Sequence, residues 1–140
     1  MPNMDLKTLD GKMVSAQSIL VGKPTVVSFW ATWCKPCVKE LNAIQDALPD
    51  WEEEVDFKMI AISVDDSRSE HRVFPFVKSR SWDFDVYLDP NSDLKRALNV
   101  ATVPHTFLFD ANGKLVWQHS GYNVGDEEEL LEKIKSIAVK

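Results

Sequence analysis

The sequence predicts a single α/β domain over residues 1–140, with a mixed central β-sheet, helices on both faces and a short N-terminal hairpin. Apolar, β-branched runs alternate with segments whose apolar residues recur every three to four positions, an order typical of parallel strands joined by helices. Near the C-terminus, Asn112-Gly113 predicts a hairpin that adds antiparallel strands to this parallel core. A chain of 140 residues suits one domain that buries roughly 70% of its unfolded surface.

The first half of the chain carries a hairpin, a buried strand and the longest helix. Residues 6–14 predict the hairpin, because its Asp-Gly pair tolerates the positive φ of a tight turn. The apolar run 25–30 predicts a central strand that is covered on both faces. From Lys35 the apolar residues follow the helical period, and we expect Pro49 to stop that helix.

The second half alternates between strands and helices. We expect strands at 55–64, 84–88, 106–109 and 114–119, and helices that begin near residues 67, 92 and 125. The run Ser67-Arg68-Ser69-Glu70 has the pattern of a capping box at the start of the first of these helices. Pro75 should then kink that helix or end it early.

Composition and charge exclude several classes of protein. A net charge of −6 without a basic run argues against nucleic-acid binding. Two cysteines cannot form a disulfide scaffold, and no apolar run approaches the roughly 20 residues that span a bilayer. The first residues lack the basic and apolar regions of a signal peptide, so either a cytosolic protein or a domain excised from a longer one is compatible with them.

Some aromatic and histidine residues indicate packing or surface positions. Trp51 and Trp82 are expected near element ends as half-buried covers of the core. The scattered residues His71 and His119 are expected at the surface.

The two cysteines, Cys34 and Cys37, follow the apolar strand and open the long helix. Unpaired backbone N–H groups and the positive end of the helix dipole stabilise a thiolate at the first of them. Lys35 adds a positive charge, and Pro36 suits the first helical turn. This arrangement predicts a redox-active pair in which Cys34 attacks and Cys37 resolves, with no other cofactor. The alternative, half of a zinc site, lacks a second ligand pair, so no metal is expected.

The stretch 29–37, Phe-Trp-Ala-Thr-Trp-Cys-Lys-Pro-Cys, is followed later by Val103-Pro104 before a strand. This combination resembles thioredoxin-fold proteins, and more narrowly the TlpA/ResA group of thiol–disulfide oxidoreductases. The resemblance covers nearly the whole chain and implies a cis bond before Pro104, in a loop that faces the cysteines and pairs with substrate backbone. It also implies that Trp33 flanks the nucleophile, and that Lys35 and Pro36 belong to the substrate-binding surface.

The resemblance also implies a role for Glu40, at the Cys-x-x-Cys-x-x-Glu position of the ResA-like group. Thioredoxin itself has a buried acid in the central strand, at a position that Ser28 occupies here. Three residues along a helix place Glu40 about one turn beyond Cys37, where a desolvated carboxylate exchanges a proton with the thiol. A solvated glutamate beside Lys39 is the alternative.

His105 directly follows the expected cis-proline, where the wider group more often has threonine. If that loop packs as in the family, the imidazole lies within reach of the sulfur atoms. It then tunes the Cys34 thiolate or shapes the substrate groove. A Cys-Cys-His site for a soft metal is the third interpretation.

We therefore expect a monomeric protein-disulfide oxidoreductase whose partners are oxidised substrate proteins. The resemblance implies a bacterial cell-envelope or periplasmic reductant, supplied by a membrane thiol carrier of the DsbD/CcdA type, with cytochrome c maturation as one use. A cytoplasmic location is the alternative. Two other functions remain open, a copper-binding or chaperone domain and a redox-inert binding domain.

Overall fold

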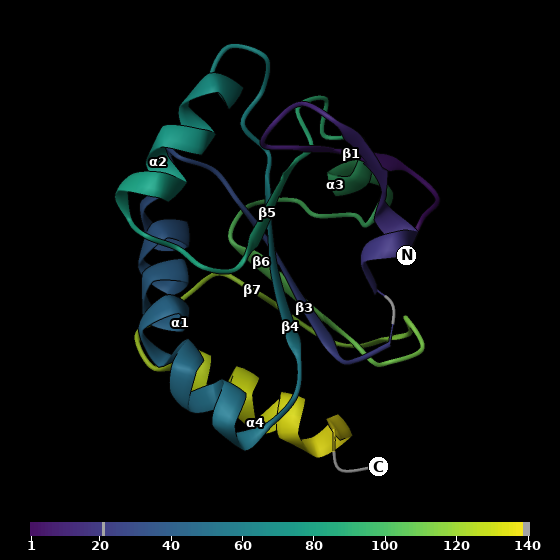
Figure 1. Ribbon diagram of the computed structural model, residues 1–140, viewed down its shortest axis with the longest axis vertical. Coiled ribbons are helices and arrows are strands. Elements are labelled where there is room, and N and C mark those ends of the chain that lie inside the picture. Colours follow the sequence, from purple (N-terminus) through teal and green to yellow (C-terminus); the bar gives the residue numbers. More distant parts are fainter. Residues whose placement is uncertain (21, 139–140) are drawn as a thin grey trace.

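The computed structural model describes residues 1–20 and 22–138, which form one seven-stranded sheet with helices on both faces (Figure 1). The elements follow one another as β1 (Asp5–Thr8), β2 (Met13–Ser15), η1 (Ala16–Leu20), β3 (Thr25–Trp30), α1 (Lys35–Glu54), β4 (Lys58–Ser63), η2 (Glu70–Arg72), α2 (Val73–Ser79), β5 (Asp85–Leu88), α3 (Asp93–Ala97), β6 (His105–Phe109), β7 (Leu115–Ser120) and α4 (Asp126–Ala138). None of the helices in the described ranges has the length and apolar character needed to cross a bilayer.

The strands lie in the order β2-β1-β5-β4-β3-β6-β7. β3, β4 and β5 are parallel to one another, which is the arrangement predicted from the alternation of strands and helices. β6 runs antiparallel to β3, and β7 runs antiparallel to β6, as the Asn-Gly hairpin predicts. The N-terminal hairpin of β1 and β2 joins the opposite side of the sheet through β5. The predicted mixed sheet is therefore confirmed.

The central strand β3 is buried along its whole length. Its side chains alternate between the two faces of the sheet. Phe29 packs edge-on against Phe107 of β6 on one face, whereas Trp30 packs against Phe76 of α2 on the other. In Figure 1, α1, α2 and α4 lie on one side of the sheet, while α3 and the N-terminal segment lie on the other.

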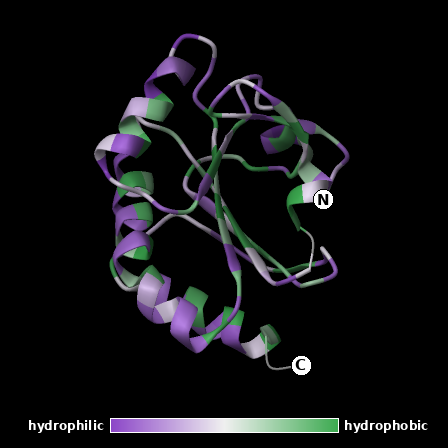
Figure 2. Cartoon of the chain, in the orientation of Figure 1, coloured by the Kyte–Doolittle hydropathy of each residue, from purple (hydrophilic) through white to green (hydrophobic). Residues whose placement is uncertain are grey.

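Hydropathy follows these two layers. Figure 2 shows hydrophobic residues along the central strands and both kinds of residue along α1 and α4. In α1 the buried residues include Leu41, Ile44 and Leu48, which follow the helical period. In α4, Leu130 and Ile134 are buried one turn apart. Each helix thus presents an apolar stripe to the sheet, and this packing holds the N-terminus of α1 at the end of β3.

The expectation that Pro49 stops the long helix was wrong, because α1 continues to Glu54 with the proline inside it. A proline in a helix interior costs about 3 kcal/mol through its missing N–H and its clash with the preceding turn. The additional turn buries Trp51, whose ring lies 6.2 Å from that of Phe57. The Val55 N–H then closes the helix on the Trp51 carbonyl at 2.9 Å. Burial of a large aromatic ring offsets the helix penalty of the proline.

The capping box expected at 67–70 was also wrong. Ser69 makes no capping hydrogen bond through its side chain, and the α-helix begins only at Val73 after the short turn η2. Asp66 is the residue that organises this turn, since its Oδ1 accepts from the Arg68 N–H at 3.0 Å. Pro75 lies in the first turn of α2, where a missing N–H costs little, and the helix continues to Ser79.

Trp82 and Trp51 are more deeply buried than expected, with exposed fractions of 7% and 5%. The Trp82 ring packs against Trp30, Phe76 and Phe84, and its Nε1–H donates to Asn42 Oδ1 at 2.9 Å. Sequence position near the end of an element did not show that one aromatic cluster would surround this ring.

Candidate active site

Cys34 caps the N-terminus of α1, and Cys37 lies in the first turn of that helix. The two residues form a disulfide, and both are nearly buried, with exposed fractions of 6% and 0%. The Cys37 N–H donates to Cys34 Sγ at 3.3 Å, so a helix N–H already points at the first sulfur atom. A thiolate at Cys34 would accept the same bond and lie at the positive end of the helix, which lowers the pKa of such a thiol.

The turn that leads into this pair is held by Asp65, a residue that sequence reasoning missed. Its carboxylate accepts from the Thr32 N–H at 2.9 Å, from Thr32 Oγ1 at 2.6 Å and from Ser63 Oγ at 2.6 Å. Thr32 and Asp65 each follow one of two adjacent parallel strands, β3 and β4, whose carboxyl ends meet at the same edge of the sheet. The expected pairing of these two strands was the signal from which a contact between Thr32 and Asp65 could have been predicted. Asp65 therefore fixes the backbone two residues before the first cysteine.

Of the residues expected to contact substrate, those next to the cysteines in sequence are exposed, whereas Pro104 is buried. Trp33 is 64% exposed, and Lys35 and Pro36 are also exposed at the start of α1. The bond between Val103 and Pro104 is cis, as the resemblance implied. Because His105 pairs with Phe29 in the register of β6 on β3, the proline loop lies beside the end of β3 from which the cysteine turn begins.

Glu40 is buried, with an exposed fraction of 3%, so the alternative of a solvated glutamate is excluded by its position. Thr106 Oγ1 of β6 lies 3.4 Å from each carboxylate oxygen of Glu40. Thr106 pairs with Ser28 of β3, so both hydroxyl groups face α1 from the sheet. The Ser28 hydroxyl lies near the carboxylate but outside hydrogen-bonding geometry to any residue of the described chain.

Burial raises the pKa of Glu40 from its ordinary 4.5 to about 7. The Thr106 and Ser28 hydroxyl groups lower the pKa, whereas the negative charges of Asp126 and Glu127 on α4 raise it further. The carboxylate thus has a proton affinity suited to proton transfer near neutral pH. The site combines a disulfide at a helix N-terminus with a buried acid one turn further along the same helix.

His105 contacts side chains of β6 and β7. Its ring stacks on Phe107 with centroids 4.5 Å apart, and its Nε2 lies 2.9 Å from Gln118 Oε1. Phe107 belongs to the face of β6 opposite to Thr106 and Glu40, since side chains alternate along a strand. In residues 1–20 and 22–138, no group of three or more His, Cys, Asp or Glu side chains is arranged to hold a metal ion.

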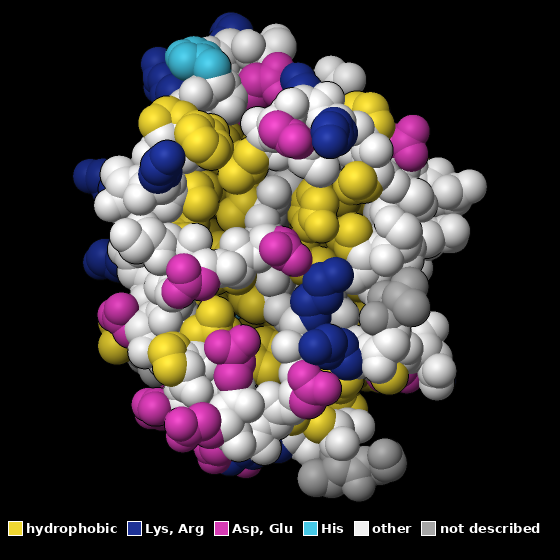
Figure 3. All heavy atoms as spheres, viewed as in Figure 1, with side chains coloured by type: hydrophobic (Ala, Val, Ile, Leu, Met, Phe, Trp, Pro, Cys, Tyr) yellow, Lys and Arg dark blue, Asp and Glu magenta, His cyan; other side chains and the backbone are white. Residues whose placement is uncertain are grey.

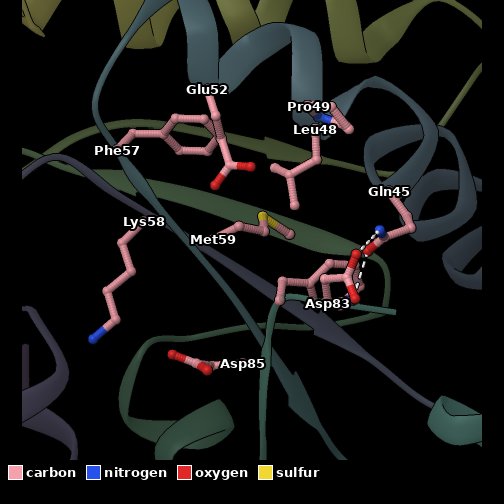
Figure 4. A pocket seen from close by; sticks show the side chains of 10 residues that line it. Gln45, Leu48, Pro49, Glu52, Phe57, Lys58, Met59, Asp83 and Asp85 are labelled. Carbon is pink, nitrogen blue, oxygen red and sulfur yellow. Dashed lines mark hydrogen bonds between the residues drawn. The ribbon is translucent and has the colours of Figure 1, made fainter. Parts of the chain in front are cut away.

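A pocket lies away from this site, between the C-terminal half of α1 and strands β4 and β5. Figure 4 shows Gln45 and Asp83 pointing toward one another across its rim, joined by hydrogen bonds of 2.9 and 2.8 Å. An apolar hollow between α2 and the neighbouring strands β1 and β5 is visible in Figure 3. Neither is lined by a residue of the cysteine turn or of the cis-proline loop.

The chain is similar in sequence to a known protein family and to known thiol-disulfide oxidoreductases. Residues 1–118 match the model of the AhpC/TSA family. Over 134 residues the chain is 31% identical to the thiol-disulfide oxidoreductase ResA of Bacillus thuringiensis subsp. konkukian, covering 95% of this chain and 75% of that protein.

Solved structures of thioredoxin-like proteins superpose on nearly the whole chain. A thioredoxin-like protein from Porphyromonas gingivalis is 41% identical and superposes with a TM-score of 0.87, covering 99% of this chain and 92% of the other. A thiol:disulfide interchange protein of the thioredoxin family from Chlorobium tepidum is 26% identical with a TM-score of 0.74, over 99% of this chain and 94% of the other.

Proposed function

The chain belongs to the AhpC/TSA family and is a thioredoxin-fold thiol–disulfide oxidoreductase of the TlpA/ResA-like group, and from this premise we propose that it reduces protein disulfides in the cell envelope. The observation that carries the proposal is the position of Cys34 at the helix cap, with the Cys37 N–H directed at its sulfur. This geometry stabilises the attacking thiolate.

The proposed reaction starts from the dithiol form. The Cys34 thiolate attacks one sulfur of a substrate disulfide, forming a mixed disulfide and releasing the first substrate thiolate. Cys37 then loses its proton and attacks Cys34 Sγ, which forms the Cys34–Cys37 disulfide and releases the second substrate thiolate. Two electrons pass to the substrate, and the internal disulfide seen in this structure is the oxidised product.

Glu40 is the proposed acceptor of the Cys37 proton in the second step. It lies three residues beyond Cys37 on α1 and is shielded from solvent. With a pKa near 7 the carboxylate is ionised above that pH and accepts the proton, whereas below it the group is already protonated. Resolution of the mixed disulfide is therefore expected to accelerate as pH rises through 7.

The exposed surface around the pair is the proposed binding site for an extended segment of the substrate protein. Trp33 offers an exposed ring beside Cys34, with Lys35 and Pro36 on the adjoining helix turn. Val103 and Pro104 form the opposite side, where the half-buried Val103 precedes the cis bond and its backbone is proposed to pair with a substrate backbone. The Pro104 carbonyl already accepts the Gly121 N–H at 2.8 Å. His105 shapes this side of the groove through its stack on Phe107.

Electrons are proposed to come from a membrane thiol carrier of the DsbD/CcdA type, and cytochrome c maturation is one use of the reduced protein. The support is the likeness to ResA thiol-disulfide oxidoreductases. We propose that the chain works in the periplasm or at the envelope as a monomer, without a bound cofactor or metal. Its exposed cysteine turn then exchanges with carrier and substrate in alternation.

Insulin reduction with dithiothreitol tests the proposed activity. We expect the wild type to catalyse it, Cys34→Ser to abolish it, and Cys37→Ser to accumulate a mixed disulfide that non-reducing electrophoresis detects. Absence of catalysis together with stoichiometric Cu(I) bound through both thiols would instead support a metal-binding function.

The direction of electron flow is tested by the reduction potential of the Cys34–Cys37 couple. Equilibration with glutathione or dithiothreitol, followed by tryptophan fluorescence, is expected to give a value below about −200 mV. A potential near about −120 mV, that of a strong oxidant, would overturn the assignment as a reductant.

A further inference from the structure

A row of polar side chains crosses three strands beneath α1 and α4. Ser28 of β3 pairs with Thr106 of β6, which in turn pairs with His119 of β7. Paired residues of adjacent strands point to the same face of a sheet. Since Ser28 and Thr106 face the Glu40 carboxylate, His119 extends this row on the same face, toward the N-terminus of α4.

His119 meets an acidic group at the start of α4. Its Nε2 lies 3.3 Å from Asp126 Oδ2, and the two side chains are 33% and 27% exposed. The same Asp126 oxygen accepts the Asn123 N–H at 2.8 Å, which fixes the carboxylate in place. Asp126 is therefore held between the end of β7 and the first turn of α4, on the side of the sheet that Glu40 occupies.

The carboxylate of the neighbouring Glu127 accepts hydrogen bonds from two neutral donors. Its Oε1 accepts from the Tyr122 hydroxyl at 2.7 Å and from the Gly125 N–H at 3.0 Å. Burial and the hydrogen bond to Glu127 raise the pKa of Tyr122, so its hydroxyl acts as a neutral donor. Among the ion pairs of the described residues, His119 is the partner of Asp126, and it carries a positive charge when it is protonated.

We propose that His119 and Asp126 act together as positioning residues for Glu40: the imidazolium of His119 neutralises Asp126 and thereby sets how readily Glu40 binds a proton. The consequence for disulfide exchange rests on the role proposed above for Glu40.

The physical basis is the repulsion between like charges in a desolvated place. An ionised Asp126 disfavours the ionised form of Glu40, and Glu127 acts in the same direction. A cation 3.3 Å from Asp126 cancels much of that repulsion, so it favours ionised Glu40. The Thr106 and Ser28 hydroxyl groups, which face Glu40 from the sheet, carry no charge near neutral pH.

The test is the ionisation midpoint of Glu40 itself, read from the carboxyl carbon in NMR spectra of protein labelled with ¹³C-glutamate. The signal is assigned by its loss in Glu40→Gln. We expect His119→Gln to raise the midpoint by about half a pH unit and Asp126→Asn to lower it by a similar amount. His119→Lys retains a cation and is expected to stay closer to the wild type than His119→Gln.

His71→Gln is the matched control, because His71 is exposed on η2 and contacts none of these groups. Its midpoint should equal that of the wild type. The effect of His119→Gln should also shrink in the Asp126→Asn background, since the two residues act as a pair. An unchanged midpoint in His119→Gln, with thermal unfolding that shows a folded protein, would overturn the inference.

The pH profile of insulin reduction separates this inference from the proposed function. A Glu40 midpoint that moves together with the exchange profile supports both. A midpoint that moves while the exchange profile of the same variant stays fixed supports the coupling and overturns the proton-transfer role of Glu40.

Discussion

Replacing Glu40 with glutamine should change the way stability depends on pH. Glu40 has a pKa raised from 4.5 to about 7 in the folded protein, mainly by burial. A difference of one unit between the folded-state and unfolded-state pKa corresponds to about 1.4 kcal/mol of free energy of unfolding. Ionising the buried carboxyl in the folded state therefore costs about 3 kcal/mol relative to the unfolded chain.

The sign follows from the order of the two pKa values. The folded-state pKa of Glu40 lies above its unfolded value. The contribution of protonated Glu40 to the free energy of unfolding is therefore fully present below pH 4.5 and is lost as pH rises through about 7. Glutamine resembles the protonated acid and never ionises. We expect Glu40→Gln to be within about 1 kcal/mol of the wild type at pH 4 but more stable than the wild type by about 3 kcal/mol at pH 8.

Urea unfolding of both oxidised proteins at the two pH values measures this difference, and other titrating groups cancel in the comparison. Glu53→Gln is the matched control, since Glu53 is exposed on the same helix and its substitution should have the same small effect at both pH values. An equal stability difference between Glu40→Gln and wild type at pH 4 and pH 8 would refute the reasoning.

Three further substitutions test the architecture of the site. Asp65→Asn should lower the free energy of unfolding by about 2 kcal/mol, as measured in urea, because three charge-assisted bonds to the cysteine turn and β4 are altered. Pro49→Ala should raise it by about 1–3 kcal/mol, because the proline lies inside α1; a loss of stability would contradict this. Trp33→Ala should reduce kcat/KM for insulin reduction about tenfold. The unfolding midpoint should stay constant, because the ring is 64% exposed. Unchanged catalysis would show that Trp33 does not contact the substrate.

Local patterns in the sequence were sufficient to predict the sheet and the cysteine site. The change from strand to helix at Cys34, the Asp-Gly and Asn-Gly hairpins and the apolar run of β3 all depend on near neighbours in the chain. The cis bond at Pro104 was expected only from the resemblance, because sequence-local preference for cis proline is weak.

Where local rules failed, tertiary packing or a residue distant in the sequence was responsible. Pro49 did not end α1, because burying Trp51 outweighs the loss of one helical hydrogen bond. The same applies to Asp65, whose role depends on two parallel strands that lie side by side although 33 residues separate it from Thr32.

What the sequence by itself determined is the chemistry that is available, namely a cysteine pair at a helix N-terminus with an acid three residues further on. Only the tertiary structure decided the environment of that acid. Glu40 is desolvated because α1 packs on the sheet, and its charged neighbours come from α4, at the far end of the chain. Burial and long-range electrostatics depend on which surfaces meet in the folded state, so the proton affinity of Glu40 follows from packing rather than from its place in a motif.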